Sequence, residues 1–151
     1  MTNIENEMYV IKRSGIHETF SFDKILNRVK KLGNEIETPL TLNYSQLVIK
    51  VIDQLYSKIS TTEIDELSAE QCASQCSKHP DYGILASRII ISNNHKNTPK
   101  TFYEAMYLLY NFKDTHGKSS PIISKDIWDV ILNNKDELNN IIEPNNDYFI
   151  D

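Results

Sequence analysis

Three cations and two expected helix starts have the chemistry of a polyphosphate site. Lys12 and Arg13 stand at the expected tip of a β-hairpin, and Lys24 lies in the first turn of the helix that follows. Thr61 lies in the first turn of a later helix. Because a helix N-terminus presents unpaired amides and a positive dipole end, two termini beside three cations would bind phosphates without a glycine-rich loop. The alternative is that these side chains are only solvated, as cations near turns usually are.

Motifs of a complete active site are missing from the sequence. It has four glycines and no Gly-x-Ser-x-Gly, His-Glu-x-x-His, Gly-x-Gly-x-x-Gly or Walker motif. Surface or capping roles are expected for its histidines, which are His17, His79, His95 and His116. Cys72 and Cys76 are four residues apart with His79 just beyond, but structural zinc usually requires four ligands. We therefore expect two half-buried thiols rather than a metal site.

The charge distribution argues against a nucleic-acid surface. The net charge is −5, with twelve Lys/Arg against twelve Asp/Glu in residues 1–100 and four against nine in residues 101–151. Neither region supplies the broad positive field that a phosphate backbone requires. No run approaches the ~18 apolar residues of a membrane span, and the first residues resemble no signal peptide. We expect a cytoplasmic protein without nucleic-acid or membrane partners.

Local patterns predict a hairpin followed by a helix. The strings YVIKR and IHETFSF alternate around Ser14-Gly15, which is typical of antiparallel strands joined by a tight two-residue turn. Ser21 is a predicted N-cap, and the apolar spacing from Phe22 to Leu32 predicts a helix that stops at Gly33-Asn34.

Three more helices are predicted before Pro99. Apolar spacing from Leu47 to Ile59 indicates an amphipathic helix. Ser60-Thr61-Thr62-Glu63 is a capping box that opens the next helix, which is expected to run to about Ser77. The string YGILASRIIISNN is apolar on nearly every side, so periodicity alone also allows a buried strand, and we interpret it as a buried helix.

The predicted fold class is mainly α with a small β-hairpin or sheet lid (α+β). Residues 1–8 are expected to be a flexible extension, and residues 9–98 a helical bundle domain. After Pro99, one helix is predicted around Phe102 to Phe112, and Ser124 is a plausible cap for one long helix or two short ones. The apolar faces of residues 99–151 have no obvious partner, which indicates part of an incomplete domain.

Several motifs, in order and at matching separations, resemble the ATP-cone of class I ribonucleotide reductase large subunits. They are VIKRSG, ETFSFDKI, TTEIDEL, HPDYGILASRI and SNNHKNT. The resemblance continues into FYEAMYLLYNF, HGKSSPIISKDIWDVILNNKDELNNII and the final DYF. It covers nearly all of residues 8–148. It implies a helical bundle with a sheet lid, followed by the first helices of the catalytic barrel domain.

The resemblance also implies a site for ATP or dATP, with Mg²⁺ expected. Phosphates would be held by Lys12, Arg13, Lys24 and Lys96. The adenine and phosphates would be wrapped by a segment made of Glu18, Thr19, Phe20, Ser21, Phe22, Asp23 and Lys24. Thr61 would support the phosphate or its Mg²⁺. Asp65 would point toward the sugar, where a carboxylate is a sensible discriminator because ATP and dATP differ by one 2′-hydroxyl.

The chain departs from the family pattern in two local features and in length. Ser14 replaces an aspartate that is common before the hairpin glycine, and seven residues precede the usual start. The family's catalytic barrel and its redox cysteines are expected beyond Asp151, and Cys72 and Cys76 correspond to none of them. We therefore expect no nucleotide reduction by this chain alone.

The implied mechanism is allosteric. ATP would favour an active arrangement of subunits and dATP an inhibited oligomer, through differential affinity for the two states. The implied partners are the rest of the large subunit, other large subunits and the small radical-generating subunit. Two rival interpretations are a helical interaction module that has lost nucleotide binding and a transcriptional regulator. Regulators that carry this domain place a four-cysteine zinc ribbon ahead of it, whereas no cysteine precedes Cys72.

Overall fold

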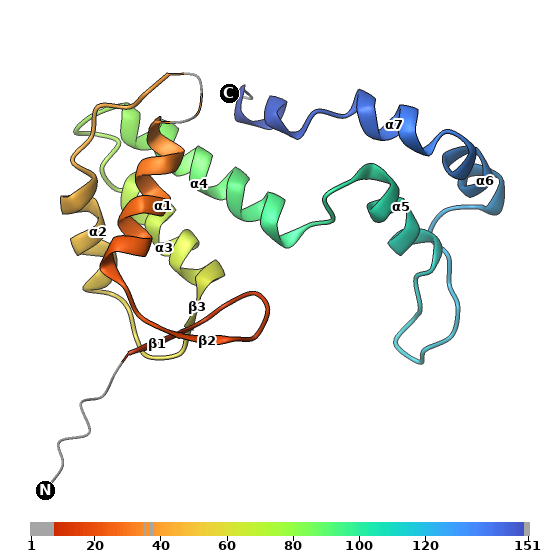
Figure 1. The fold of residues 1–151 in the computed structure, drawn as a ribbon, viewed down its shortest axis with the longest axis horizontal. Coiled ribbons are helices and arrows are strands. Elements are labelled where there is room, and N and C mark those ends of the chain that lie inside the picture. Colours follow the sequence, from red (N-terminus) through yellow and green to blue (C-terminus); the bar gives the residue numbers. More distant parts are fainter. Residues whose placement is uncertain (1–7, 35, 37, 150–151) are drawn as a thin grey trace, which may run out of the picture. The chain divides into compact units, whose positions relative to one another are not determined.

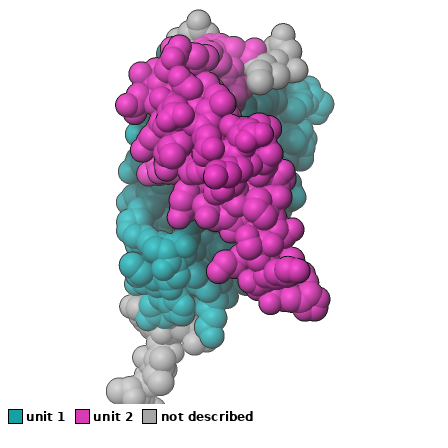
Figure 2. Space-filling view, turned by 90° about the vertical axis from the view of Figure 1, so that its right-hand side faces the viewer, with its two compact units in different colours: residues 1–93 teal, residues 94–151 magenta. Residues whose placement is uncertain are grey.

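The computed structural model describes residues 8–34, 36 and 38–149, which form two compact units, residues 1–93 and 94–151 (Figures 1 and 2). Among the described residues, three helices, most of a fourth and a three-stranded sheet make up the first unit, so the predicted mainly α class with a small sheet is confirmed. Residues 1–7 of the predicted extension lie outside the described residues. The predicted domain limits, 9–98 and 99–151, stay a prediction.

The sheet has the strand order β2-β1-β3. Strands β1 (Tyr9–Ile11) and β2 (His17–Thr19) are antiparallel, which confirms the predicted hairpin. The predicted two-residue turn is wrong, because the amide of Gly15 donates to the carbonyl of Lys12 and the amide of Lys12 to the carbonyl of Ile16. These bonds close a three-residue loop in which Gly15 has φ +79°, a conformation that favours glycine.

Helix α1 (Phe22–Asn34) confirms the predicted first helix, although the predicted stop has a different cause. Gly33 lies inside the last turn, and a Cβ there would come within 2.7 Å of the Tyr44 ring. The glycine is therefore required by the close approach of Tyr44. The carbonyls that end α1 are satisfied by Arg88, which donates to Leu32 at 3.3 Å and to Gly33 at 3.2 Å.

The predicted second helix is too long. Helix α2 (Tyr44–Ile52) is followed by turns and then by strand β3 (Ile59–Ser60), which pairs parallel with β1. Ile59 is fully buried in the core beneath the sheet. Ile59 is therefore part of a two-residue strand and not of the end of a helix. The backbone enters this strand through Lys58, which has φ +70°.

Helices α3 (Thr61–Ala73) and α4 (Asp81–Asn97) complete the bundle (Figure 1). The capping box at Ser60 is confirmed, and α3 ends four residues before the predicted Ser77. The helical interpretation of α4 is confirmed, with Leu85 and Ile89 in the core. Its opposite side is exposed, since Ile84 and Ile90 retain 44% and 47% of their accessible surface.

The second unit packs around one tryptophan. It contains α5 (Phe102–Tyr110), α6 (Lys125–Asn133), α7 (Lys135–Ile141) and a 3-10 helix, η1 (Pro144–Phe149). Of the two predicted arrangements after Ser124, the structure has two short helices. Trp128 stacks on Tyr110 with ring centroids 5.0 Å apart, and Tyr103 lies 5.5 Å away. Among the described residues, no helix has the length and apolar character that crossing a membrane requires.

Candidate functional site

The parallel pairing of β1 with β3 decides where the hairpin turn lies. Ile11 is opposite Ser60 in this register, and α3 begins directly after Ser60. The chain leaves Ile11 into the turn, so Lys12 and Arg13 extend toward the first turn of α3. Helix α1 begins three residues after the end of β2. Two helix N-termini therefore lie beside one small sheet.

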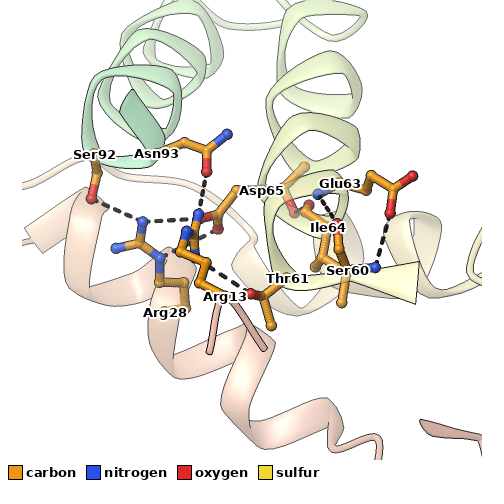
Figure 3. Close-up of polar contacts among 10 residues, drawn as sticks. Arg13, Arg28, Ser60, Thr61, Glu63, Ile64, Asp65, Ser92 and Asn93 are labelled. Atoms are coloured by element: carbon orange, nitrogen blue, oxygen red, sulfur yellow. Dashed lines mark hydrogen bonds and ion pairs between the residues drawn. The ribbon is translucent and has the colours of Figure 1, made fainter. Parts of the chain in front are cut away.

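Arg13 links the hairpin turn to two helices (Figure 3). Its Nη1 donates to Thr61 Oγ1 at 3.4 Å, and its Nη2 donates to Asp65 Oδ2 at 3.3 Å, both on α3. Nη2 also donates to Asn93 Oδ1 on α4. One flexible side chain thus connects elements that are 48 to 80 residues apart in the sequence.

A second arginine, Arg28 of α1, meets the same carboxylate (Figure 3). Its Nε lies 3.3 Å from Asp65 Oδ1, and its Nη2 lies 3.2 Å from Asp65 Oδ2 and 2.8 Å from Ser92 Oγ. Asp65 is only 6% exposed. Because a buried carboxylate requires a nearby positive charge, the two guanidinium groups around Asp65 stabilise its ionised form. We call this group the Asp65 cluster: Arg13, Arg28, Thr61, Asp65, Ser92 and Asn93.

A second carboxylate lies closer to solvent. Glu18 of β2 forms ion pairs with Lys12 before the turn and with Lys24 in the first turn of α1. Its side chain is 19% exposed, whereas those of Lys12 and Lys24 are 49% and 67% exposed. We call these three residues the Glu18 cluster. Since lysine ammonium groups are compact, well hydrated and carried on flexible stems, this cluster is easily rearranged.

The capping box holds the helix turn that carries Thr61. The amide of Ser60 donates to Glu63 Oε2 at 2.9 Å, the amide of Glu63 donates to Ser60 Oγ at 3.1 Å, and the Tyr56 hydroxyl donates to Glu63 Oε1 at 3.0 Å. The pKa of Glu63 is lowered mainly by the hydrogen bond from the Ser60 amide, and further by hydrogen bonds with the Ser60 and Tyr56 side chains. The first turn of α3 is therefore well ordered beside the hairpin.

Other predicted site residues run from the end of β2 to the first turn of α1: Thr19, Phe20, Ser21, Phe22 and Asp23. The amide of Lys24 donates to Ser21 Oγ at 3.4 Å, as expected for the predicted cap. Phe20 and Phe22 are partly buried and pack against the core. Thr19 and Asp23 are exposed. This short segment therefore links the Glu18 cluster to the start of α1.

Lys96 and the two cysteines lie outside these clusters. Lys96 is exposed in the last turn of α4 and belongs to residues 94–151, so its place in the site stays a prediction. Cys72 is buried and Cys76 is exposed, and both thiols are free. Burial raises the pKa of Cys72 to about 12, which keeps that thiol protonated at neutral pH.

Three members of the Asp65 cluster were not predicted from the sequence: Arg28, Ser92 and Asn93. The sequence feature that could have revealed them is a polar residue at a helix position where the spacing predicts an apolar one. Ser92 and Asn93 follow Ile89 by three and four residues, so they continue the buried face of α4 with polar groups. Arg28 follows Ile25 by three residues on α1. Polar residues in line with a buried helix face indicate a buried polar network.

The chain resembles known proteins over most of its length. The model of the ATP cone domain family matches residues 8–97. The ribonucleoside-diphosphate reductase large subunit of Danio rerio is 45% identical over 142 residues, which cover 93% of this chain and 18% of that protein. The large subunits of Caenorhabditis elegans and Monkeypox virus are 42% and 44% identical, over 95% and 89% of this chain and 18% of each relative.

The resemblance noted in the sequence is thereby confirmed. The chain corresponds to the N-terminal part of these large subunits and spans about a fifth of their length. The family model covers more than half of the 151 residues. The chain therefore belongs to the ATP-cone family.

Proposed function

We propose that the first unit binds ATP or dATP as an allosteric effector, and that the Asp65 and Glu18 clusters together form the site. The observation that carries this proposal is the reach of Arg13 from the hairpin turn to α3 and α4. With all six charged groups ionised, Lys12, Lys24, Arg13 and Arg28 outweigh Glu18 and Asp65 by two positive charges. A net positive site favours a triphosphate.

Phosphates would enter by exchanging partners with carboxylates. Lys12 and Lys24 share Glu18, and both are half-exposed or more, so a triphosphate can reach them without opening the core. Arg13 has a side chain 26% exposed and stands on a turn, so it too can swing toward phosphate. The N-terminal ends of α1 and α3 add the positive ends of two helix dipoles. Lys96, which the family resemblance implies as a further phosphate ligand, belongs to residues 94–151, so its part in binding stays a prediction.

Sugar, base and metal are assigned by residue chemistry. Asp65 has the acceptor oxygens that a ribose hydroxyl requires. The Thr61 hydroxyl would support the phosphate or its Mg²⁺, and it lies 3.4 Å from Arg13 Nη1. The segment from Glu18 to Lys24 would wrap the adenine and phosphates. Phe20 and Phe22 in that segment supply apolar surface for the base.

The proposed role of binding is regulation of ribonucleotide reduction. As part of a reductase large subunit, the ATP-cone would favour an active arrangement with ATP and an inhibited oligomer with dATP. The partners would be the rest of the large subunit, further large subunits and the small radical-generating subunit. The effector acts only through the difference in its affinity for the two states, which typically corresponds to about 1–3 kcal/mol.

Titration calorimetry of the 151-residue chain tests nucleotide binding. We expect heat on addition of ATP and of dATP, and at least a tenfold loss of affinity for both in R13Q and K24Q, because each variant removes a phosphate donor. K78Q, which changes an exposed lysine after α3, is the matched control. No heat at millimolar nucleotide would contradict the proposal and favour a helical interaction module.

A nucleotide-reduction assay tests the expectation that this chain does not act alone. The chain is incubated with a ribonucleoside diphosphate and a dithiol reductant, and deoxyribonucleotide is measured by chromatography. We expect no turnover, because Cys72 is buried and protonated and no family catalytic motif matches either cysteine. Turnover without any added protein would overturn that expectation.

A further inference from the structure

Two arginines contact Asp65 in different ways. Arg28 spans both carboxylate oxygens, with Nε near Oδ1 at 3.3 Å and Nη2 near Oδ2 at 3.2 Å. Arg13 approaches the same carboxylate with its Nη2, which lies 3.3 Å from Oδ2. A two-point contact fixes the orientation of the carboxylate plane, whereas a one-point contact leaves it free to rotate.

The two arginines also project from backbone elements that differ in rigidity. Arg28 projects from the second turn of α1, and Ser92 Oγ of α4 accepts from its Nη2 at 2.8 Å. Arg13 projects from a three-residue turn between two short strands. In the proposed complex, Arg13 turns toward the phosphates and its contact with Asp65 weakens. The Asp65 side chain, which is nearly buried, still requires a cation, and Arg28 remains in place to supply it.

We propose that Arg28 is a positioning residue: it holds the Asp65 carboxylate toward the nucleotide sugar and so sets the discrimination between ATP and dATP. This inference rests on the proposed function, since it assumes that the first unit binds these nucleotides. Arg28 acts through Asp65 and does not contact the phosphates. It also joins α1, α3 and α4 in one contact, so sugar recognition is tied to the packing of three helices (Figure 3).

The test compares the dissociation constants for ATP and dATP in variants of the full chain. In R28Q we expect the ratio of the two constants to move toward one by about tenfold, because an unaligned carboxylate no longer senses one hydroxyl well. R28K keeps the charge but loses the two-point geometry, so its ratio should stay close to that of R28Q. K30Q, which changes an exposed cation two residues further along α1, should keep the wild-type ratio.

Thermal unfolding separates positioning from stability. We expect R28K to stay folded and to unfold several degrees below wild type, because it loses the contact with Ser92, while its ratio falls as far as that of R28Q. S92A should lose similar stability but keep the wild-type ratio, a difference that a merely structural role of Arg28 would not produce. The double variant D65N/R28Q should have the same ratio as D65N alone, because Arg28 acts through Asp65. A double variant that discriminates less than D65N would overturn the inference.

The remaining outcomes distinguish this inference from the proposed function. If wild-type chain binds neither nucleotide, the proposed function fails. If it binds both and R28Q keeps the wild-type ratio, only the positioning role fails. An equal loss of ATP and dATP affinity in R28Q would show that Arg28 serves the phosphates, which also overturns the positioning role. A wild-type ratio of one would leave nucleotide binding intact and remove the discrimination assigned to Asp65 and Arg28.

Discussion

The Asp65 cluster and the Glu18 cluster both neutralise a carboxylate, but they differ in the type of cation and in burial. Each has one carboxylate between two cations. Asp65 is nearly buried and is held by arginines from a turn and a helix, with Thr61, Ser92 and Asn93 around them. Glu18 is held by two lysines that are largely in solvent.

The difference indicates that the two clusters have different roles. Planar guanidinium groups fix a carboxylate at two points and tolerate burial, whereas lysine ammonium groups stay hydrated and exchange partners easily. The Asp65 cluster therefore ties α1, α3 and α4 into a fixed frame. Under the proposed function, the Glu18 cluster would be a reservoir of cations for an incoming polyphosphate. Stability is expected to depend on the first and ligand affinity on the second.

Removal of Asp65 is expected to have the largest effect. In D65A, two partly buried guanidinium groups face each other without a carboxylate, so the free energy of unfolding should fall by about 3 kcal/mol. Urea unfolding followed by circular dichroism measures the loss, while fluorescence of Trp128 reports the second unit separately. E66A, at the exposed neighbouring position of α3, is the control. A loss below about 1 kcal/mol would mean that the frame does not depend on Asp65.

Loss of a lysine from the Glu18 cluster should show the opposite profile. K12Q is expected to weaken ATP binding about tenfold, which corresponds to about 1.4 kcal/mol, because one phosphate donor is lost. The free energy of unfolding should change by less than about 0.5 kcal/mol, since the Lys12 side chain is 49% exposed. Calorimetry and urea unfolding of the same preparation give both values. A stability loss larger than the affinity loss would reverse the assigned roles.

Sequence reasoning located the local features that surround these clusters. The hairpin, the Ser60 capping box and the start of α1 depend on residues close together in the chain, so short patterns predicted them. The second helix was predicted to continue to Ile59 because Leu55 and Ile59 have helical spacing. A parallel partner 49 residues away in β1 instead makes Ile59 part of a two-residue strand, and so short a strand leaves no periodic signal.

The candidate site was predictable to the same degree. Lys12, Arg13 and Lys24 were predicted from their places at a turn and a helix start. Arg28 was not, because its role depends on the crossing of α1 with α3 and α4, which no local pattern encodes. The register between β1 and β3 likewise decides that Arg13 reaches Asp65. Long-range geometry therefore distinguishes the Asp65 cluster from isolated charged residues.

Ser92 offers a finer test of the frame. In S92A, Arg28 Nη2 loses an acceptor at 2.8 Å, but its side chain is 23% exposed and water can replace part of that bond. The free energy of unfolding should fall by about 1 kcal/mol. S87A is the matched control, because the Ser87 hydroxyl donates to the carbonyl of Ile84 on the exposed side of the same helix. Equal losses in both variants would remove any special role for the contact with Arg28.

The smallest effect is expected for E18Q, and it decides whether the two clusters truly differ. Because the lysine partners of Glu18 are 49% and 67% exposed, its neutral analogue should change the free energy of unfolding by less than about 0.5 kcal/mol. That change should shrink further in 1 M salt, where the Debye length is about 3 Å. D65N measured in parallel should lose more stability and respond less to salt, because Asp65 is nearly buried. Equal losses in the two variants, with equal salt dependence, would show that burial and guanidinium geometry do not separate the clusters, and the frame and the reservoir would be one site.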